Sequence, residues 1–153
     1  MATSLIPAIM DFYAGLSFAN NDQKRIFLDK KPQKLASQTA EVTFPYAILE
    51  DIGMVPEHMF ENNPQEVTTV KIKIYATTLE EVDAMVKTLR FNNQDVKLGA
   101  GMDYCTTFSL PSDMATEGTL LQNLVKRLDD QRGPNGSLVY RAELTYVIRN
   151  NYV

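Results

Sequence analysis

The chain contains few of the side chains on which most enzymes depend. Among its 153 residues there is one histidine, His58, and one cysteine, Cys105. A single cysteine excludes an internal disulfide, and no second His or Cys stands at metal-ligand spacing from His58. Cys105 lies in an alternating stretch, which favours a small packing residue over a nucleophile. We therefore expect no enzymatic activity, no metal and no cofactor.

Recognisable catalytic and nucleotide-binding motifs are also missing. No Gly-x-Ser-x-Gly nucleophile motif is present. The segment 98–104 has two of the glycines of a dinucleotide fingerprint, but Tyr104 replaces the third small residue and the pattern after it is not helical. Glu50 and Asp51 are adjacent in an expected strand, so their carboxylates point to opposite faces and cannot act together as a general acid–base pair. These segments predict turns and solvated strand ends.

Long hydrophobic runs are absent as well. No run approaches the roughly 20 apolar residues that a membrane-spanning helix needs. Residues 1–18 have no Lys or Arg before their apolar positions and include Asp11, which is not typical of a secretory leader. The hydrophobic share of 44% and the charged share of 22% are ordinary for globular proteins. We expect one soluble domain over residues 1–153, in a reducing compartment and without membrane contact.

Basic residues are fewer than acidic ones overall, but they are concentrated in one segment. The formal net charge of −4 argues against a free-standing nucleic-acid binder, so sequence-specific nucleic-acid binding is not expected. Five of the fifteen basic residues nevertheless fall within positions 24–34. They are Lys24, Arg25, Lys30, Lys31 and Lys34. This segment is either a solvated loop or a patch that faces an acidic partner or passing DNA.

What the sequence does contain is a clear order of helical and strand patterns. Helical spacing begins after Ser4, a good N-cap, and alternation is strongest from Val67 onward. In chain order the patterns predict a helix over 5–18, strands over 25–28, 44–50 and 67–75, a helix over 79–89, a strand over 102–110, a helix over 117–130 and a strand over 138–148. This order predicts an α+β fold with a single mixed or antiparallel sheet and helices packed mainly on one face.

The helix over 79–89 has the strongest local signal. Thr78 and Glu81 form a Ser/Thr-x-x-Glu capping box, in which each side chain satisfies an unpaired amide at the helix start. An apolar stripe follows at helical spacing and predicts the buried face. The stripe consists of Leu79, Val82, Met85, Val86 and Leu89.

The longest predicted loop covers residues 51–65. It contains five turn-forming residues, namely Gly53, Pro56, Asn62, Asn63 and Pro64. Met54, His58, Met59 and Phe60 lie among them. These side chains either form a contact surface for a partner or fold back onto the sheet of the same molecule. The apolar residues after Tyr146 likewise belong either to a docking edge or to the core.

The whole pattern resembles a family of phage proteins. The features that carry the resemblance are the N-terminal helix, the strand at Arg25-Ile26-Phe27, the strand at 44–49, the strand at 70–75 with its helix, and the final strand at 140–144. Over most of the chain they are similar to the tail-terminator (tail-completion, minor tail) proteins of tailed bacteriophages and prophages.

The resemblance implies a structural virion protein. It implies copies that assemble into a ring, commonly hexameric, at the head-proximal end of the tail tube. Such a ring ends tube polymerisation and joins the tail to the head connector, so its partners are other copies of itself, the tail tube protein and the head–tail connector protein. The location is then the virion tail, assembled in the cytoplasm of the bacterial host. Protein contacts would involve Met54, His58, Met59 and Phe60, together with Lys30 and Lys31.

Two other functions remain open on the sequence alone. The predicted β-α-β-α-β order over 67–148 also suits a ferredoxin-like regulatory domain that binds a small molecule. Another head–tail connector, or neck, protein would behave much like a tail terminator but would have different partners.

Overall fold

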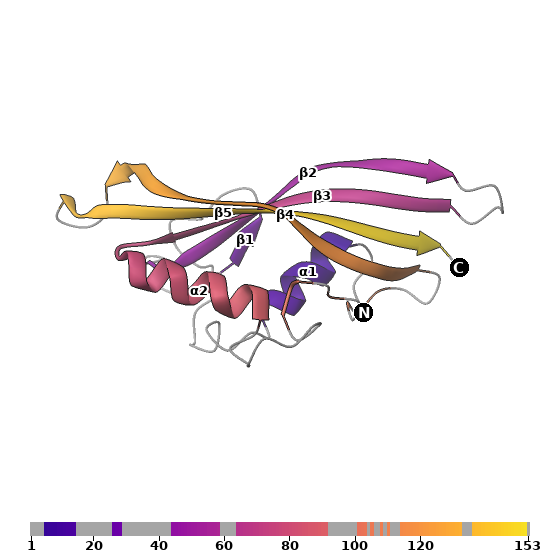
Figure 1. The fold of residues 1–153 in the computed structure, drawn as a ribbon, viewed down its shortest axis with the longest axis horizontal. Coiled ribbons are helices and arrows are strands. Elements are labelled where there is room, and N and C mark those ends of the chain that lie inside the picture. Colours follow the sequence, from indigo (N-terminus) through magenta and orange to yellow (C-terminus); the bar gives the residue numbers. More distant parts are fainter. Residues whose placement is uncertain are drawn as a thin grey trace, which may run out of the picture.

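The computed structural model describes residues 5–14, 26–28, 44–58, 64–91, 101–103, 105, 108, 110, 114–132 and 136–152. These residues form two helices and one five-stranded sheet (Figure 1). The elements are α1 (Leu5–Ala14), β1 (Ile26–Leu28), β2 (Tyr46–His58), β3 (Pro64–Ala76), α2 (Leu79–Phe91), β4 (Met114–Arg132) and β5 (Leu138–Tyr152). The strand order is β1-β2-β3-β5-β4, with β1 parallel to β2 and the other neighbours antiparallel. The predicted α+β class with a single mixed sheet is confirmed.

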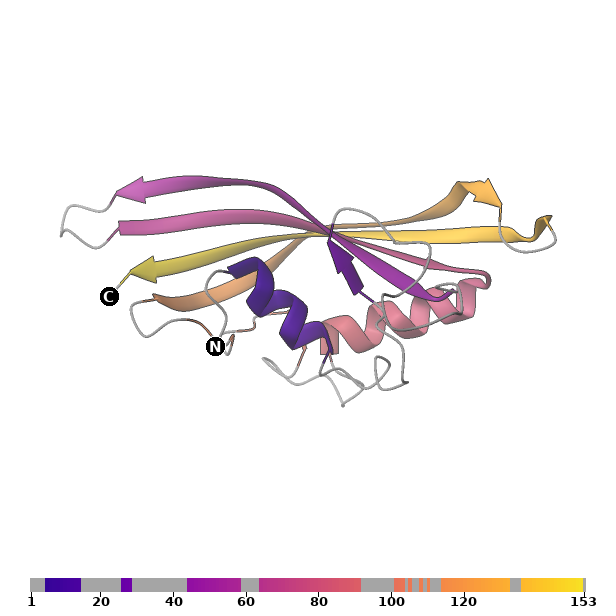
Figure 2. The ribbon, with the colours of Figure 1, turned by 180° about the vertical axis from the view of Figure 1, so that it is seen from behind.

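The main core lies between the sheet and the two helices, which occupy the same side of the sheet in both views (Figures 1 and 2). Alternate residues of β3 point into this core, as the sequence predicted. Val70, Ile72 and Ile74 are fully buried there. From the helices they meet Ile9 of α1 and Leu89 of α2 in one cluster. The predicted alternation therefore places the core on the correct face of β3.

The opposite face of the sheet is polar in the middle and aromatic at one end. Lys73 Nζ lies 2.9 Å from Glu50 Oε1, and this hydrogen bond raises the pKa of Lys73. Tyr46 and Tyr75 stack with their ring centroids 5.0 Å apart. They form a second buried cluster with Phe27 and Val139. The sheet thus has a helix-covered face and a second face of mixed character.

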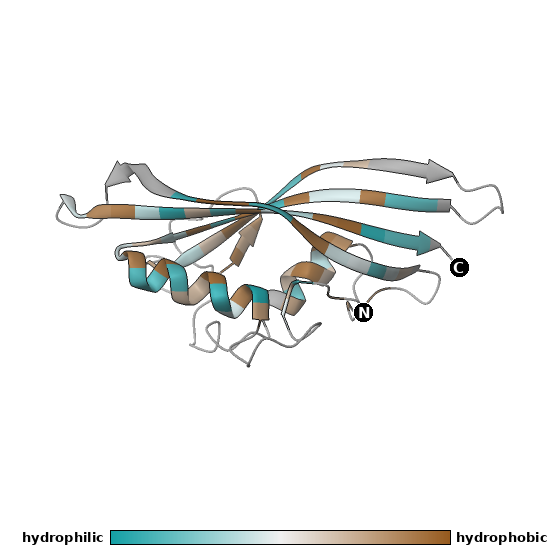
Figure 3. Ribbon diagram, in the orientation of Figure 1, coloured by the Kyte–Doolittle hydropathy of each residue, from teal (hydrophilic) through white to brown (hydrophobic). Residues whose placement is uncertain are grey.

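Helix α2 begins with the Thr78 half of the predicted capping box. The Glu81 amide donates a hydrogen bond of 3.2 Å to Thr78 Oγ1. The predicted apolar stripe is buried at Val82, Met85, Val86 and Leu89, which gives α2 alternating hydrophobic and hydrophilic positions (Figure 3). The prediction is wrong for Leu79. This residue is the first of the helix, and it is 49% exposed.

Replacing Thr78 with alanine is expected to destabilise the protein by about 1 kcal/mol, because the Glu81 amide loses its acceptor at the helix start. Urea unfolding followed by circular dichroism measures this difference. Thr78→Ser is the matched control, since serine keeps the hydroxyl acceptor. An equal loss in both variants would contradict a capping role for the hydroxyl.

The predicted helix over 117–130 is wrong, because these residues belong to the long strand β4. The strand has register shifts between Thr116 and Gly118, between Leu121 and Asn123, and near its C-terminal end. Each shift inserts residues into a period-two pattern. Leu121 and Leu124 both pack against the core although they are three positions apart. Irregularities in a strand therefore produced the spacing that is typical of a helix.

The predicted strand over 102–110 is also wrong for the residues described there. Met102 and Asp103 form a bend and turn, and Cys105 and Phe108 reach the core without belonging to a strand. The segment is instead bound to the end of α2. The Met102 amide donates to the Leu89 carbonyl at 2.7 Å. The alternation of apolar and polar residues in this segment therefore comes from packing against the core and not from pairing in a sheet.

The predicted loop over 51–65 is wrong for residues 51–58 and 64–65, which belong to strands. Strand β2 continues to His58, and β3 starts at Pro64. The pairing is irregular only between Asp51 and Gly53, where Gly53 has a φ of 152° and donates its amide to Asp51 Oδ1 at 3.1 Å. Gly53 suggested a turn in the sequence, but in the structure it lies in a β-bulge, where glycine is common.

Candidate functional site: two open sheet edges

Among the described residues, the sheet has an open edge on each side. Within the described part of the chain, β4 pairs with β5 alone. On the other side, β1 covers β2 at Ala47, Ile48 and Leu49, and no other described residue pairs with the outer side of β2 beyond them. We call the outer side of β4 the β4 edge, and the outer side of residues 50–58 the β2 edge. Unpaired backbone donors and acceptors along such edges are templates for pairing with another strand.

Exposed hydrophobic side chains accompany these outer strands. Six large hydrophobic residues are exposed among those described, and four of them lie on β1, β2 or β4. These four are Leu28, Ile52, Met54 and Leu120. Single exposed hydrophobic residues are common on protein surfaces. Their concentration on the outermost strands adds apolar contact area to the backbone groups that the edges leave unpaired.

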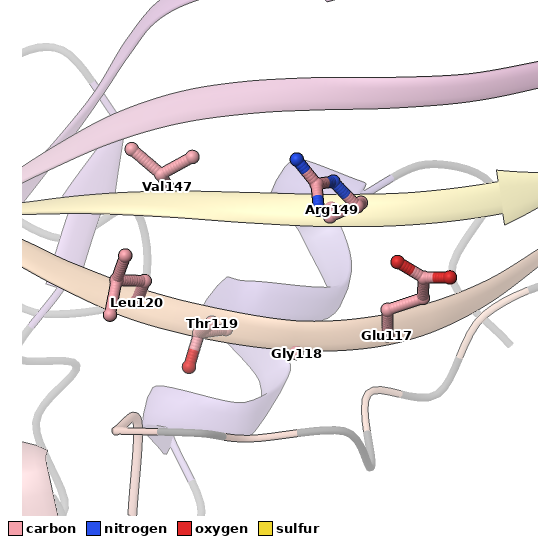
Figure 4. A pocket seen from close by; sticks show the side chains of 6 residues that line it. All are labelled: Glu117, Gly118, Thr119, Leu120, Val147 and Arg149. Carbon is pink, nitrogen blue, oxygen red and sulfur yellow. The ribbon is translucent and has the colours of Figure 1, made fainter. Parts of the chain in front are cut away.

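A hollow of about 330 Å³ lies at the β4 edge. It is lined by Glu117, Gly118, Thr119, Leu120, Val147 and Arg149 (Figure 4). Leu120 is paired with Val147, and their side chains stand on the same side of the sheet. A Cβ built on Gly118 would meet no atom within 4 Å. The missing side chain at Gly118 therefore leaves space beside an apolar wall.

Two charged side chains border this hollow. Glu117 accepts hydrogen bonds from Asn151 Nδ2 at 2.6 Å and from Gln65 Nε2 at 3.3 Å, so its carboxylate is engaged by the neighbouring strands. Arg149, on β5 opposite Gly118, is exposed. The hollow combines an apolar wall with a cation at its border. This combination suits an apolar side chain next to an acidic one.

Thr119 connects this surface to the interior. Its side chain points to the side opposite Leu120 (Figure 4). Thr119 Oγ1 accepts a hydrogen bond from the Cys105 amide at 2.9 Å and donates to the Met102 carbonyl. The β4 backbone next to the hollow is therefore fixed by the 102–105 segment beneath it.

A buried polar cluster holds that segment in place. The Tyr146 hydroxyl donates to Asp103 Oδ1 at 2.7 Å, and Arg90 Nε donates to Asp103 Oδ2 at 3.0 Å. Burial and the hydrogen bond to Asp103 raise the pKa of Tyr146, because both disfavour a phenolate. The cluster joins α2, β5 and the 101–103 turn, which is a structural role.

The residues predicted as protein contacts fall in different places. Met54 lies on the β2 edge with 49% of its surface exposed, which agrees with a contact role. His58 is the last residue of β2, and its backbone is opposite Pro64. Met59, Phe60, Lys30 and Lys31 lie outside the described residues. The structure therefore places two of the six on one sheet edge.

Sequence reasoning missed the residues of the β4 edge. Gly118 and Leu120 were expected in a helix over 117–130, with Leu120 on its apolar face, and Arg149 received no role. A signal for the strand was present in Asn135-Gly136, since Asn-Gly between two apolar segments predicts a hairpin with a strand on each side. Gly136 has a φ of 73°, and β4 and β5 pair on both sides of the turn, beginning with Arg132 and Leu138.

Within the described part of the chain, no helix has the length and hydropathy needed to cross a membrane. No group of three or more His, Cys, Asp or Glu side chains among the same residues is arranged to hold a metal ion. No protein-family model matches the chain, and comparison with curated proteins found no significantly similar sequence.

Proposed function

We propose that the protein is a structural component of a phage tail, which forms a ring at the head-proximal end of the tail tube, ends tube polymerisation and joins the tail to the head connector. The observation that supports this proposal most directly is the presence of two open edges on opposite sides of one sheet. The resemblance of the element order to tail-terminator proteins supplies the biological setting.

Strand direction makes the two edges compatible with each other. β2 is antiparallel to β3, β3 to β5, and β5 to β4, so β2 and β4 run in opposite directions. A second copy placed beside β4 in the same orientation would present its β2 edge antiparallel to β4. This contact uses a different surface on each partner and repeats from copy to copy. Such a head-to-tail contact generates a ring when the rotation between copies closes.

The mechanism in this proposal is steric and adhesive. The ring docks on the last ring of tube subunits and blocks the surface to which the next subunits would add. Its opposite side faces the head connector. Each contact is modest, but symmetry repeats it around the ring, so the combined binding is strong without a catalytic centre.

The structure makes the ferredoxin-like alternative less well supported. A ferredoxin-like regulatory domain was predicted from a β-α-β-α-β order over 67–148. Residues 117–130 are strand and not helix, so the second helix of that order is missing. A different neck protein remains the second candidate, because it would use the same open edges with other partners.

Light scattering and negative-stain microscopy on the purified protein, alone and with polymerising tail tube protein, test the proposal. We expect closed rings in at least one of these samples, and we expect tubes whose growth stops once the protein is added. A fixed dimer in both samples, or rings that leave tube growth unchanged, would contradict the proposal. Rings that bind connector protein but not tube protein would favour another neck component.

A further inference from the structure

We infer that the hollow at the β4 edge receives Ile52 from the β2 edge of a neighbouring copy. This inference rests on the proposed function, since it assigns the contact that joins one protomer to the next in the ring. It commits to a second copy of this chain as the occupant, and it names one side chain and the site that holds it.

Ile52 is the large apolar side chain nearest the start of the β2 edge. β1 stops covering β2 at Leu49, so the open part begins at Glu50. Ile52 falls at the register shift between Asp51 and Gly53, where it has no partner residue on β3. It is 53% exposed. A neighbouring strand along this edge would meet Ile52 near the beginning of the pairing.

The hollow on β4 offers the matching apolar surface. Leu120 is 56% exposed and stands beside Val147, next to the space that Gly118 leaves. An isoleucine placed there would contact the walls of the hollow and would cover Leu120. Both exposed side chains would leave water in the same contact, and this burial of apolar surface favours the pairing.

The backbone limits where the two edges can pair. β4 contains no proline, so each of its residues keeps an N–H group. β2 contains Pro56, which has no N–H to donate. Pairing is therefore best supported over the first part of the β2 edge, before Pro56, and this part contains Ile52.

Two variants test the contact from its two sides. Gly118→Leu places a side chain in the hollow, where a Cβ at Gly118 would meet no atom within 4 Å. Ile52→Asp removes the apolar side chain. We expect each variant to raise the dissociation constant for self-association at least tenfold, measured by light scattering across concentration. Leu79→Asp is the matched control, because Leu79 is 49% exposed on α2, away from both edges, and it should assemble as the wild type does.

A cysteine pair gives an independent measurement. Ile52→Cys combined with Leu120→Cys should form disulfides between copies under oxidation, with a ladder that ends at the copy number of the ring. Cys105 is buried and stays in place as a non-reactive background. Either single variant should give no ladder.

The outcomes separate the two proposals. Rings that form normally in Gly118→Leu and Ile52→Asp, with no ladder in the cysteine pair, would overturn the contact and leave the ring function standing. A ladder ending in closed rings that do not stop tube growth would support the contact and contradict the proposed role in the tail. A wild-type protein that stays monomeric alone and with tube protein would overturn both.

Discussion

Replacing Gly101 with alanine is expected to destabilise the protein by about 3 kcal/mol, the upper range for overpacking a well-packed interior. A Cβ at this position would overlap the Arg90 carbonyl and the Phe91 amide at the end of α2. These are backbone atoms, so no rotamer change can relieve the overlap. The adjacent turn cannot move away without breaking the hydrogen bond between the Met102 amide and the Leu89 carbonyl.

Gly118→Ala is the control for this prediction. A Cβ at Gly118 meets nothing within 4 Å, so alanine there should change stability by less than about 1 kcal/mol, in the stabilising direction through reduced freedom of the unfolded chain. Urea unfolding of both variants measures the difference between an obstructed and an open glycine. Equal midpoints for Gly101→Ala and the wild type would show that the turn and α2 are not in close contact.

The features that the sequence predicted correctly share one property, which is an uninterrupted pattern. The alternation at Val70, Ile72 and Ile74 persists because β3 has partners on both sides and one face against the core. The capping box at Thr78 predicted the start of α2 because its chemistry is local. Features whose cause lies within a few residues can be predicted without knowing the tertiary structure.

The spacing of apolar residues in β4 could not by itself predict a strand, because this spacing depends on the partner strand. Register shifts against β5 place residues three apart on the same face, as Leu121 and Leu124 show. The candidate site has the same limitation. Leu120 and Gly118 matter because β4 is the last strand of the sheet, and strand order is a property of the whole fold. Met54 was selected as a loop residue, whereas the structure places it on an edge strand.

The interior and the β4 edge are connected through Thr119. Its hydroxyl is held by the Met102 carbonyl and the Cys105 amide, while its neighbours Gly118 and Leu120 line the hollow. A fixed edge strand loses less conformational entropy when another strand pairs with it. The polar contacts beneath β4 would therefore lower the entropic cost of the contact that we propose at this edge.

Replacing Asp103 with alanine is expected to destabilise the protein by about 3 kcal/mol, because it removes the shared acceptor of the buried cluster. The Tyr146 hydroxyl would lose its partner inside the core, which costs about 1–3 kcal/mol by itself. Arg90 would lose its ion pair, but its side chain is 30% exposed, so water compensates for part of that loss.

Asp83→Ala is the matched control, since it also removes an aspartate from an ion pair. Asp83 and its partner Lys126 are 49% and 39% exposed, so this pair should contribute less than about 1 kcal/mol. Urea unfolding of Asp103→Ala, Asp83→Ala, Tyr146→Phe and the Asp103→Ala/Tyr146→Phe double variant measures each loss. The double variant should be less destabilised than the sum of its single variants, because each change removes the same hydrogen bond. Strict additivity, or equal losses at the two aspartates, would contradict the buried cluster, and with it the link between the interior and the β4 edge.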